Sequence, residues 1–188
     1  MRALRSHKTK ATTKVPTGIL GFDDITNGGL PRERTTLLVG GPGSGKTIFA
    51  MQFLVHGAQH GKEPGIFVAF EEAPERIVAN FEGFGWKLGE LQKKKLFFLD
   101  AQPAPDLIKS GDFDLGGLLA VLGAKAKEMG ARRIVFDALD ILLTLLPDPA
   151  TQRREVYRLH DWLLASGMRS KSWTSLRNPS SHWRRVSS

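Results

Sequence analysis

The hydrophobic positions of this chain form short continuous runs that alternate with longer stretches of helical spacing. Continuous apolar runs are typical of strands buried on both faces, and they occur at 35–39, 65–70, 96–99 and 133–137. Apolar residues at helical spacing predict helices at 46–59, 75–84, 115–129 and 151–166. Strands that alternate with helices predict the α/β class, with a mainly parallel central sheet and helices on both faces.

Two further segments complete this prediction. Residues 19–25 are expected to form a short helix that packs on the core through its four apolar side chains, which are Ile19, Leu20, Phe22 and Ile25. Residues 101–111 contain two prolines and are predicted to form a loop.

One glycine and four acidic residues follow the predicted strands at their carboxyl ends, where open α/β sheets bind ligands. They are Gly40, Glu71, Glu72, Asp100 and Asp137. This convergence favours a single catalytic site at one edge of the sheet.

The most informative of these strand ends is 40–47, Gly-Gly-Pro-Gly-Ser-Gly-Lys-Thr, which fits the P-loop pattern G-x-x-x-x-G-K-[ST]. Glycines allow positive φ and let several N–H groups surround one anion. The predicted strand before the loop and the helix after it place a bound phosphate at a helix N-terminus. The residues expected to bind the nucleotide are Gly41, Pro42, Gly43, Ser44, Gly45, Lys46, Thr47 and Ile48.

Three roles follow for the side chains of this region. Lys46 is expected to contact the β- and γ-phosphates and is therefore also a catalytic candidate. The Thr47 hydroxyl is a predicted Mg²⁺ ligand, and Asp137, at the end of a later apolar strand, is the predicted acidic partner for the metal. The alternative for Asp137 is an acid that only caps the loop after its strand. The predicted cofactors are ATP and Mg²⁺.

Glu71 and Glu72 are the candidates for the group that activates or orients the attacking water. On an extended backbone, adjacent side chains point to opposite faces, so both cannot serve one water equally. The sequence does not select between them. The alternative is a solvated acidic turn before a helix whose dipole favours acids.

Composition narrows the class of protein. The chain has 188 residues, enough for one ordinary domain, and contains no cysteine, which excludes disulfides and thiolate metal sites. No apolar run reaches the roughly 18–20 residues that span a membrane, so we expect a soluble, cytoplasmic protein. The net charge of +8 is carried by the ends, because 1–14 and 168–188 each contribute five basic and no acidic residues. Nucleic-acid binding is therefore not the favoured explanation of the charge.

Several of these stretches together resemble the KaiC domain, a member of the RecA-like P-loop ATPases. Besides the P-loop and 132–137, they are Pro16-Thr17-Gly18, Gly28-Gly29-Leu30-Pro31, Phe70-Glu71-Glu72, Phe84-Gly85-Trp86-Lys87-Leu88 and Arg153-Arg154-Glu155. The resemblance implies ATP and Mg²⁺ bound between subunits of a hexameric ring, slow hydrolysis, and in some members phosphate transfer to their own Ser or Thr. It also implies that Glu71 and Glu72 are the catalytic carboxylates.

The resemblance covers about 14–167 and sets the expected domains. Residues 1–14 are a flexible basic leader and 15–167 the ATPase domain. Residues 168–188 are basic and Ser-rich without an apolar run, which favours an incomplete domain that lacks a strand and carries a non-native tail. The arginine pairs Arg132-Arg133 and Arg153-Arg154 are expected to be solvated, or else to face the phosphate of a neighbouring subunit.

Two other functions are compatible with the same ATPase core. A RecA- or DnaB-like DNA motor needs basic or aromatic channel loops, but 101–114 and 138–150 contain Lys109 and otherwise mainly acids, prolines and leucines. A nucleotide-gated interaction protein without significant turnover is the remaining alternative.

Overall fold

The computed structural model describes residues 13–103, 114–168 and 170–175. The expectations for most of the leader (1–12), for 104–111 of the predicted loop and for 176–188 of the tail therefore lie outside the described residues.

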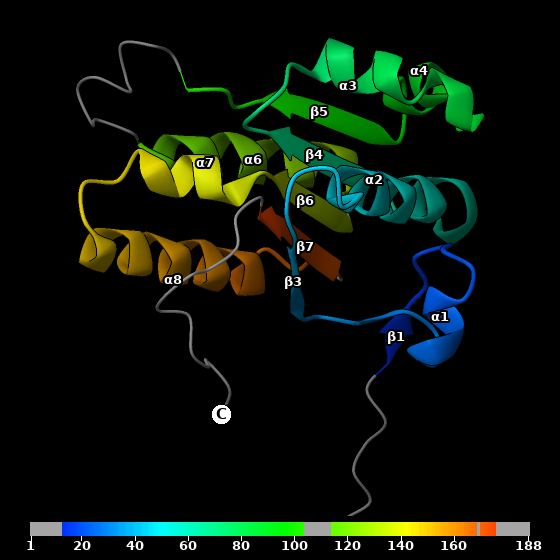
Figure 1. The fold of residues 1–188 in the computed structure, drawn as a ribbon, viewed down its shortest axis with the longest axis horizontal. Coiled ribbons are helices and arrows are strands. Elements are labelled where there is room, and N and C mark those ends of the chain that lie inside the picture. The colour runs from blue at the N-terminus through cyan, green and yellow to red at the C-terminus, as the bar shows by residue number, and fades with distance from the viewer. Residues whose placement is uncertain (1–12, 104–113, 169, 176–188) are drawn as a thin grey trace, which may run out of the picture.

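Five parallel strands form the central sheet in the order β3-β7-β6-β4-β5 (Figure 1). Their bounds are β3 Thr35–Val39, β4 Gly65–Ala69, β5 Leu96–Asp100, β6 Arg133–Asp137 and β7 Ser170–Ser175. A separate antiparallel pair joins β1 (Lys14–Val15) to β2 (Leu30–Pro31). The predicted α/β class with a parallel sheet is confirmed.

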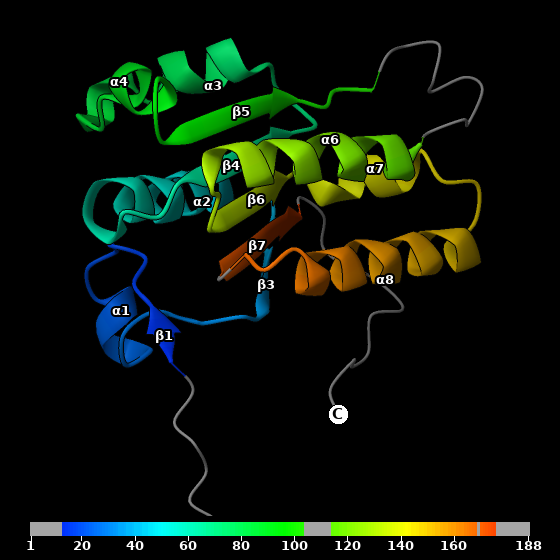
Figure 2. The same cartoon turned by 180° about the vertical axis from the view of Figure 1, so that it is seen from behind.

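Helices cover both faces of the sheet (Figures 1 and 2). One face carries α2 (Lys46–His56), α3 (Pro74–Asn80) and α4 (Leu88–Gln92), and the other carries α6 (Leu115–Met129), α7 (Leu139–Thr144) and α8 (Pro149–Ala165). Because side chains alternate along a strand, β4 and β6 feed two separate cores. Phe67, Ala69 and Val135 pack with α2, whereas Ile66, Val68 and Ile134 pack with α6 and α8.

Some helix boundaries differ from those predicted. The helix after the P-loop ends at His56 and continues as a π-helical turn, Gly57–Gly61, and the helix expected at 75–84 ends at Asn80 before a 3₁₀ turn, Glu82–Phe84. The short helix α1 (Phe22–Ile25) exists, but the prediction that the apolar residues of 19–25 pack on the core is wrong for Leu20 and Ile25, which are 98% and 80% exposed. Phe22 does pack, edge-on, against Phe49 of α2 at 5.0 Å between ring centroids.

The strand β7 corrects the expectation that the sheet lacks a strand beyond Gly167. Residues 170–175 lie between β3 and β6, with Lys171 in register with both Thr35 and Ile134. An interior strand is held by main-chain hydrogen bonds along both edges. A segment without an apolar run can therefore occupy this place.

Arg133, at the start of β6, is the largest fully buried side chain described, with only 1% of its surface exposed. Its Nε and Nη2 both pair with Glu63 Oε2, at 2.8 and 2.7 Å. Its Nη1 donates to the carbonyls of Phe53 in α2, at 2.7 Å, and of Pro16 before α1, at 3.0 Å. The expectation of a solvated or intersubunit arginine is wrong for Arg133, because these acceptors compensate its desolvation inside the core.

Removal of the charge of Glu63 should leave the Arg133 guanidinium buried without a counter-ion. We expect Glu63→Gln to lower the free energy of unfolding by about 3–5 kcal/mol. Glu128→Gln, which removes a carboxylate from the exposed pair with Lys125, should cost less than about 1 kcal/mol. Urea unfolding followed by circular dichroism measures both, and equal effects of the two substitutions would contradict a structural role of the buried pair.

Candidate nucleotide site

The loop between β3 and α2 bends at two glycines with left-handed backbone. Gly43 has φ 74° and Gly45 has φ 81°, a region that L-residues with a Cβ rarely adopt. Gly45 is also the residue that immediately precedes α2. The turn therefore sets the direction in which the helix leaves the sheet.

The N-terminus of α2 supplies an anion-binding surface. The first intrahelical hydrogen bond in this turn runs from Phe49 N to Gly45 O, at 2.9 Å. In such a helix the N–H groups of Lys46, Thr47 and Ile48 have no intrahelical acceptor, and the helix dipole favours negative charge there. A phosphate fits this donor set.

The side chain of Lys46 is folded into the loop itself. Its Nζ donates to the carbonyls of Gly40 and Gly41, each at 2.8 Å, and to Ser44 Oγ at 3.1 Å. The residue is buried. Three acceptors therefore hold its positive charge in place at the loop, where the predicted phosphate would lie.

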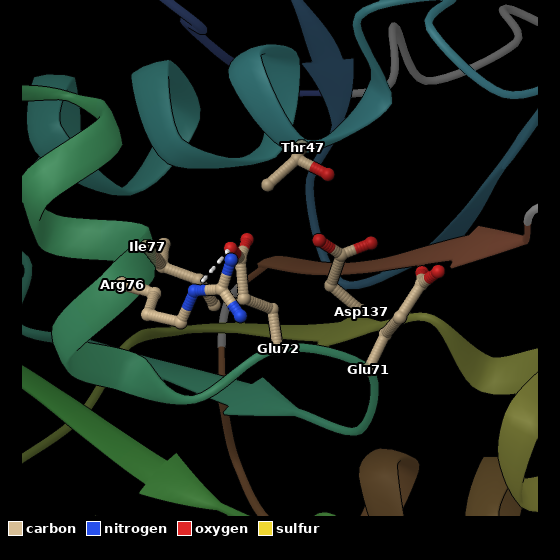
Figure 3. A pocket seen from close by; sticks show the side chains of 6 residues that line it. All are labelled: Thr47, Glu71, Glu72, Arg76, Ile77 and Asp137. Atoms are coloured by element: carbon tan, nitrogen blue, oxygen red, sulfur yellow. Dashed lines mark ion pairs between the residues drawn. The ribbon is translucent and has the colours of Figure 1, made fainter.

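A cleft of about 360 Å³ opens beside this loop at the carboxyl ends of the strands (Figure 3). It is lined by residues from α2, from the segment after β4, from α3 and from the end of β6, which are Thr47, Glu71, Glu72, Arg76, Ile77 and Asp137. In Figure 3, Glu71 and Asp137 lie on one side, Glu72 and Arg76 on the other, and Thr47 above them. A hydroxyl and a carboxylate are ligands suited to Mg²⁺, so the pair Thr47 and Asp137 fits this ion.

Both glutamates reach this cleft, although an extended backbone would send them to opposite faces. The reason is that β4 ends at Ala69, and the chain bends at Phe70, Glu71 and Glu72 before α3 begins at Pro74. Phe70 N donates to Asp137 O at 2.7 Å, so the bend starts beside the end of β6.

The two carboxylates have different surroundings. Burial raises the pKa of Glu71, and the negative charges of Asp137, Asp140 and Glu72 raise it further, while Lys46 opposes them. Glu72 instead accepts hydrogen bonds from Asn80 Nδ2 at 3.2 and 3.3 Å and pairs with Arg76 Nε at 3.6 Å. The structure thus distinguishes two groups that the sequence left equivalent: Glu72 is held by partners, and Glu71 is crowded by other acids.

Other residues near the site have supporting positions. Gln102 Nε2 donates to Glu71 O at 2.8 Å, and Gln102 N donates to Asp100 Oδ1 at 3.0 Å. Asp100 does not line the cleft. The sequence analysis missed Gln102, Arg76 and Asn80. Spacing could have revealed the last two, because they lie four and eight residues after Glu72 and so share a face of the following helix.

The arrangement defines the class of protein. A parallel sheet, a strand–P-loop–helix unit and an acid at the end of another parallel strand together form a P-loop NTPase domain of the RecA type. The sequence profile described as "ATPase: KaiC" matches residues 15–171, and the chain belongs to this family.

Curated relatives agree with this family. A circadian clock oscillator protein KaiC of Prochlorococcus marinus is 46% identical over 148 residues, which are 78% of this chain and 30% of that protein. The circadian clock proteins KaiC2 and KaiC3 of Synechocystis are 41% and 43% identical over 82% and 86% of this chain. The matched regions are 28% and 32% of those two proteins, so the chain spans about a third of the relatives' length or less. In the part of the chain that the structure describes, no helix is long and apolar enough to cross a membrane.

The charge of Glu71 should destabilise the free protein. A carboxyl whose pKa is raised by folding binds its proton more tightly in the folded state, so its ionised form costs stability above the folded pKa. That cost disappears as the pH falls toward 4.5, the ordinary value. We expect Glu71→Gln, in EDTA and without nucleotide, to increase the free energy of unfolding near neutral pH. The gain should be below about 1 kcal/mol, because the carboxyl is only partly withdrawn from water, which screens its charge.

Denaturant titrations at a series of pH values from about 4 to about 8 measure this gain. Glu75→Gln, which removes an exposed acid from the first turn of α3, is the control. A decrease in stability for Glu71→Gln at neutral pH would show that the carboxylate has a favourable partner instead.

Proposed function

We propose that this chain binds ATP with Mg²⁺ in the cleft beside the P-loop and hydrolyses the ATP. The observation that carries the proposal is that Thr47, Asp137 and both glutamates line one cleft at the N-terminus of α2. The family, described as an ATPase, supports the reaction class. The loop from Gly41 to Thr47, with Ile48, holds the phosphates, and Lys46 provides their closest positive charge.

Glu71 is the general base in this proposal, and Glu72 is a positioning residue of the cleft that does not itself accept the proton. The metal, held by Thr47 and Asp137, would neutralise charge on the phosphate oxygens. In the reaction, a water oxygen forms a bond to the γ-phosphorus, the bond from that phosphorus to the bridging oxygen breaks, and the water proton passes to Glu71. The products are ADP and inorganic phosphate. A raised pKa favours this role because it makes the carboxylate a better proton acceptor.

Two finer parts of the proposal derive from the family. A Ser or Thr hydroxyl of the chain could replace water as the acceptor, which would make the protein an autokinase. Copies of the chain would self-associate into hexameric rings, as KaiC domains do, so that each nucleotide lies between subunits. Lys109 lies outside the described residues, and no observation on the described part favours a DNA motor.

Incubation of the purified protein with γ-labelled ATP and Mg²⁺ tests the reaction, when free phosphate is separated from label on the protein. Free phosphate is the expected product, and label on a Ser or Thr would establish the kinase activity. Bound ATP with neither product would contradict hydrolysis and favour a nucleotide-gated interaction protein.

Lys46→Ala should weaken ATP binding about tenfold to a hundredfold, because it removes a charge-assisted contact worth about 1.5–3 kcal/mol. Lys93→Ala, at an exposed position after α4, should leave binding unchanged. Isothermal titration with a non-hydrolysable ATP analogue measures both. Unchanged affinity in Lys46→Ala would rule out the P-loop as the phosphate site.

The two glutamates should separate in turnover. We expect Glu71→Gln to retain ATP binding and to lower kcat about 10²- to 10⁴-fold, the range for loss of a general base. Glu72→Gln should cause a smaller loss. Phosphate release under saturating ATP measures both variants, and a larger loss in Glu72→Gln would exchange the two roles.

A further inference from the structure

We propose that Arg76 is a second cation of the phosphate site, whose guanidinium binds the γ-phosphate of ATP from within the same chain. The inference rests on the proposed function and adds a residue that distinguishes ATP from ADP by binding the third phosphate. On binding ATP, the guanidinium of Arg76 would either release Glu72, its partner in the free protein, or contact Glu72 and the γ-phosphate together.

The charge of the cleft is the first argument. Its lining contains three carboxylates, those of Glu71, Glu72 and Asp137, and Arg76 is the one cationic side chain among these lining residues. ATP brings further negative charge, and phosphoryl transfer develops charge on the γ-phosphate oxygens. Lys46 is held at the loop by three acceptors. A cation on the opposite side of the cleft from Asp137 would balance negative charge on γ-phosphate oxygens that the metal does not neutralise.

The position of Arg76 is the second argument. Arg76 belongs to the first turn of α3, and its N–H donates to Ala73 O at 3.0 Å. Pro74 and Ile77 of the same turn are buried, and Ile77 also lines the cleft. The backbone that carries Arg76 is thus anchored in the core, while its side chain lies at the cleft (Figure 3).

The third argument is that the present partner of Arg76 binds it weakly. The Nε–Oε1 distance to Glu72 is 3.6 Å, and the two side chains are 79% and 35% exposed. Exposed ion pairs of this kind contribute little, because water screens the two charges. An arginine contact to phosphate is charge-assisted and can be bidentate, and is stronger. The guanidinium can therefore exchange a carboxylate for the γ-phosphate at little cost.

The competing explanation is that Arg76 only holds Glu72, together with Asn80. The two explanations differ in their dependence on the third phosphate. A group that binds the γ-phosphate favours ATP over ADP, whereas a group that only holds Glu72 affects both nucleotides alike.

The experiment compares the affinities of a non-hydrolysable ATP analogue and of ADP, each with Mg²⁺, by isothermal titration. We expect Arg76→Ala to weaken binding of the analogue about tenfold or more and to change that of ADP less than about twofold. Arg76→Lys, which keeps the charge but loses the planar fork, should recover part of the loss. Arg158→Ala is the matched control, because Arg158 is an exposed helical arginine paired with Glu155, and it should change neither affinity.

Asn80→Ala separates the two explanations, since it removes only the other partner of Glu72 and should leave the ratio of the two affinities unchanged. An equal loss for both nucleotides in Arg76→Ala, no loss for either, or the same selective loss in Asn80→Ala would overturn the inference. Failure of the unmodified protein to bind either nucleotide would instead overturn the proposed function, and with it this inference.

Discussion

The buried guanidinium of Arg133 is the contact on which the geometry of this domain depends. An uncompensated charge in the core would cost several kcal/mol, so its acceptors must stay where they are. These acceptors are Glu63 before β4, the carbonyl of Phe53 in α2 and the carbonyl of Pro16. One side chain therefore ties together the P-loop helix, two neighbouring strands and the segment that leads to α1. The ring of Phe53 lies 4.5 Å from this guanidinium and adds a cation–π contact.

The same strand carries the predicted metal ligand at its other end. Residues 133, 135 and 137 point to one side of β6, because side chains alternate, and Val135 packs in the core that contains α2. Arg133 fixes the last part of α2 through Phe53, Val135 fills the space between, and Asp137 lies at the cleft beside Thr47, near the start of α2. Strand and helix are thus held together along their length, which sets the separation of the two groups proposed to hold the metal.

The sequence was most informative where the local pattern and the tertiary environment agree. The strands at 65–69 and 133–137 are buried on both faces, so their continuous apolar runs reveal them directly. The helix at 115–129 begins after the capping carboxylate of Asp114 and ends before Gly130, and its predicted bounds are those observed. The P-loop needs particular glycines for its backbone, and these are visible in the sequence.

The prediction was wrong or undecided where distant residues determine the outcome. Nothing near Arg133 in the sequence shows that Glu63, 70 positions away, will bury it as an ion pair. β7 could not be recognised from its sequence, because it has no apolar run and is held by its place between two strands. The difference between Glu71 and Glu72 comes from Asn80, Arg76 and Asp137, which only the fold brings to them. Leu20 and Ile25 have the hydrophobicity of core residues but are exposed to solvent, which their spacing alone could not show.

The position of β7 also constrains the order in which the domain folds. Among the described strands of the central sheet, β3 pairs only with β7, so the strand that carries the P-loop joins the sheet through residues 170–175. The other three strands can pair with one another first. Pairing of β3 with β7 closes a loop that contains the other three strands, and such long-range closure is entropically costly and slow compared with local pairing. During synthesis, the P-loop strand emerges early but must wait for a segment more than a hundred residues later before its sheet is complete. The strand that leads into the proposed nucleotide site is therefore placed in the sheet only through residues 170–175.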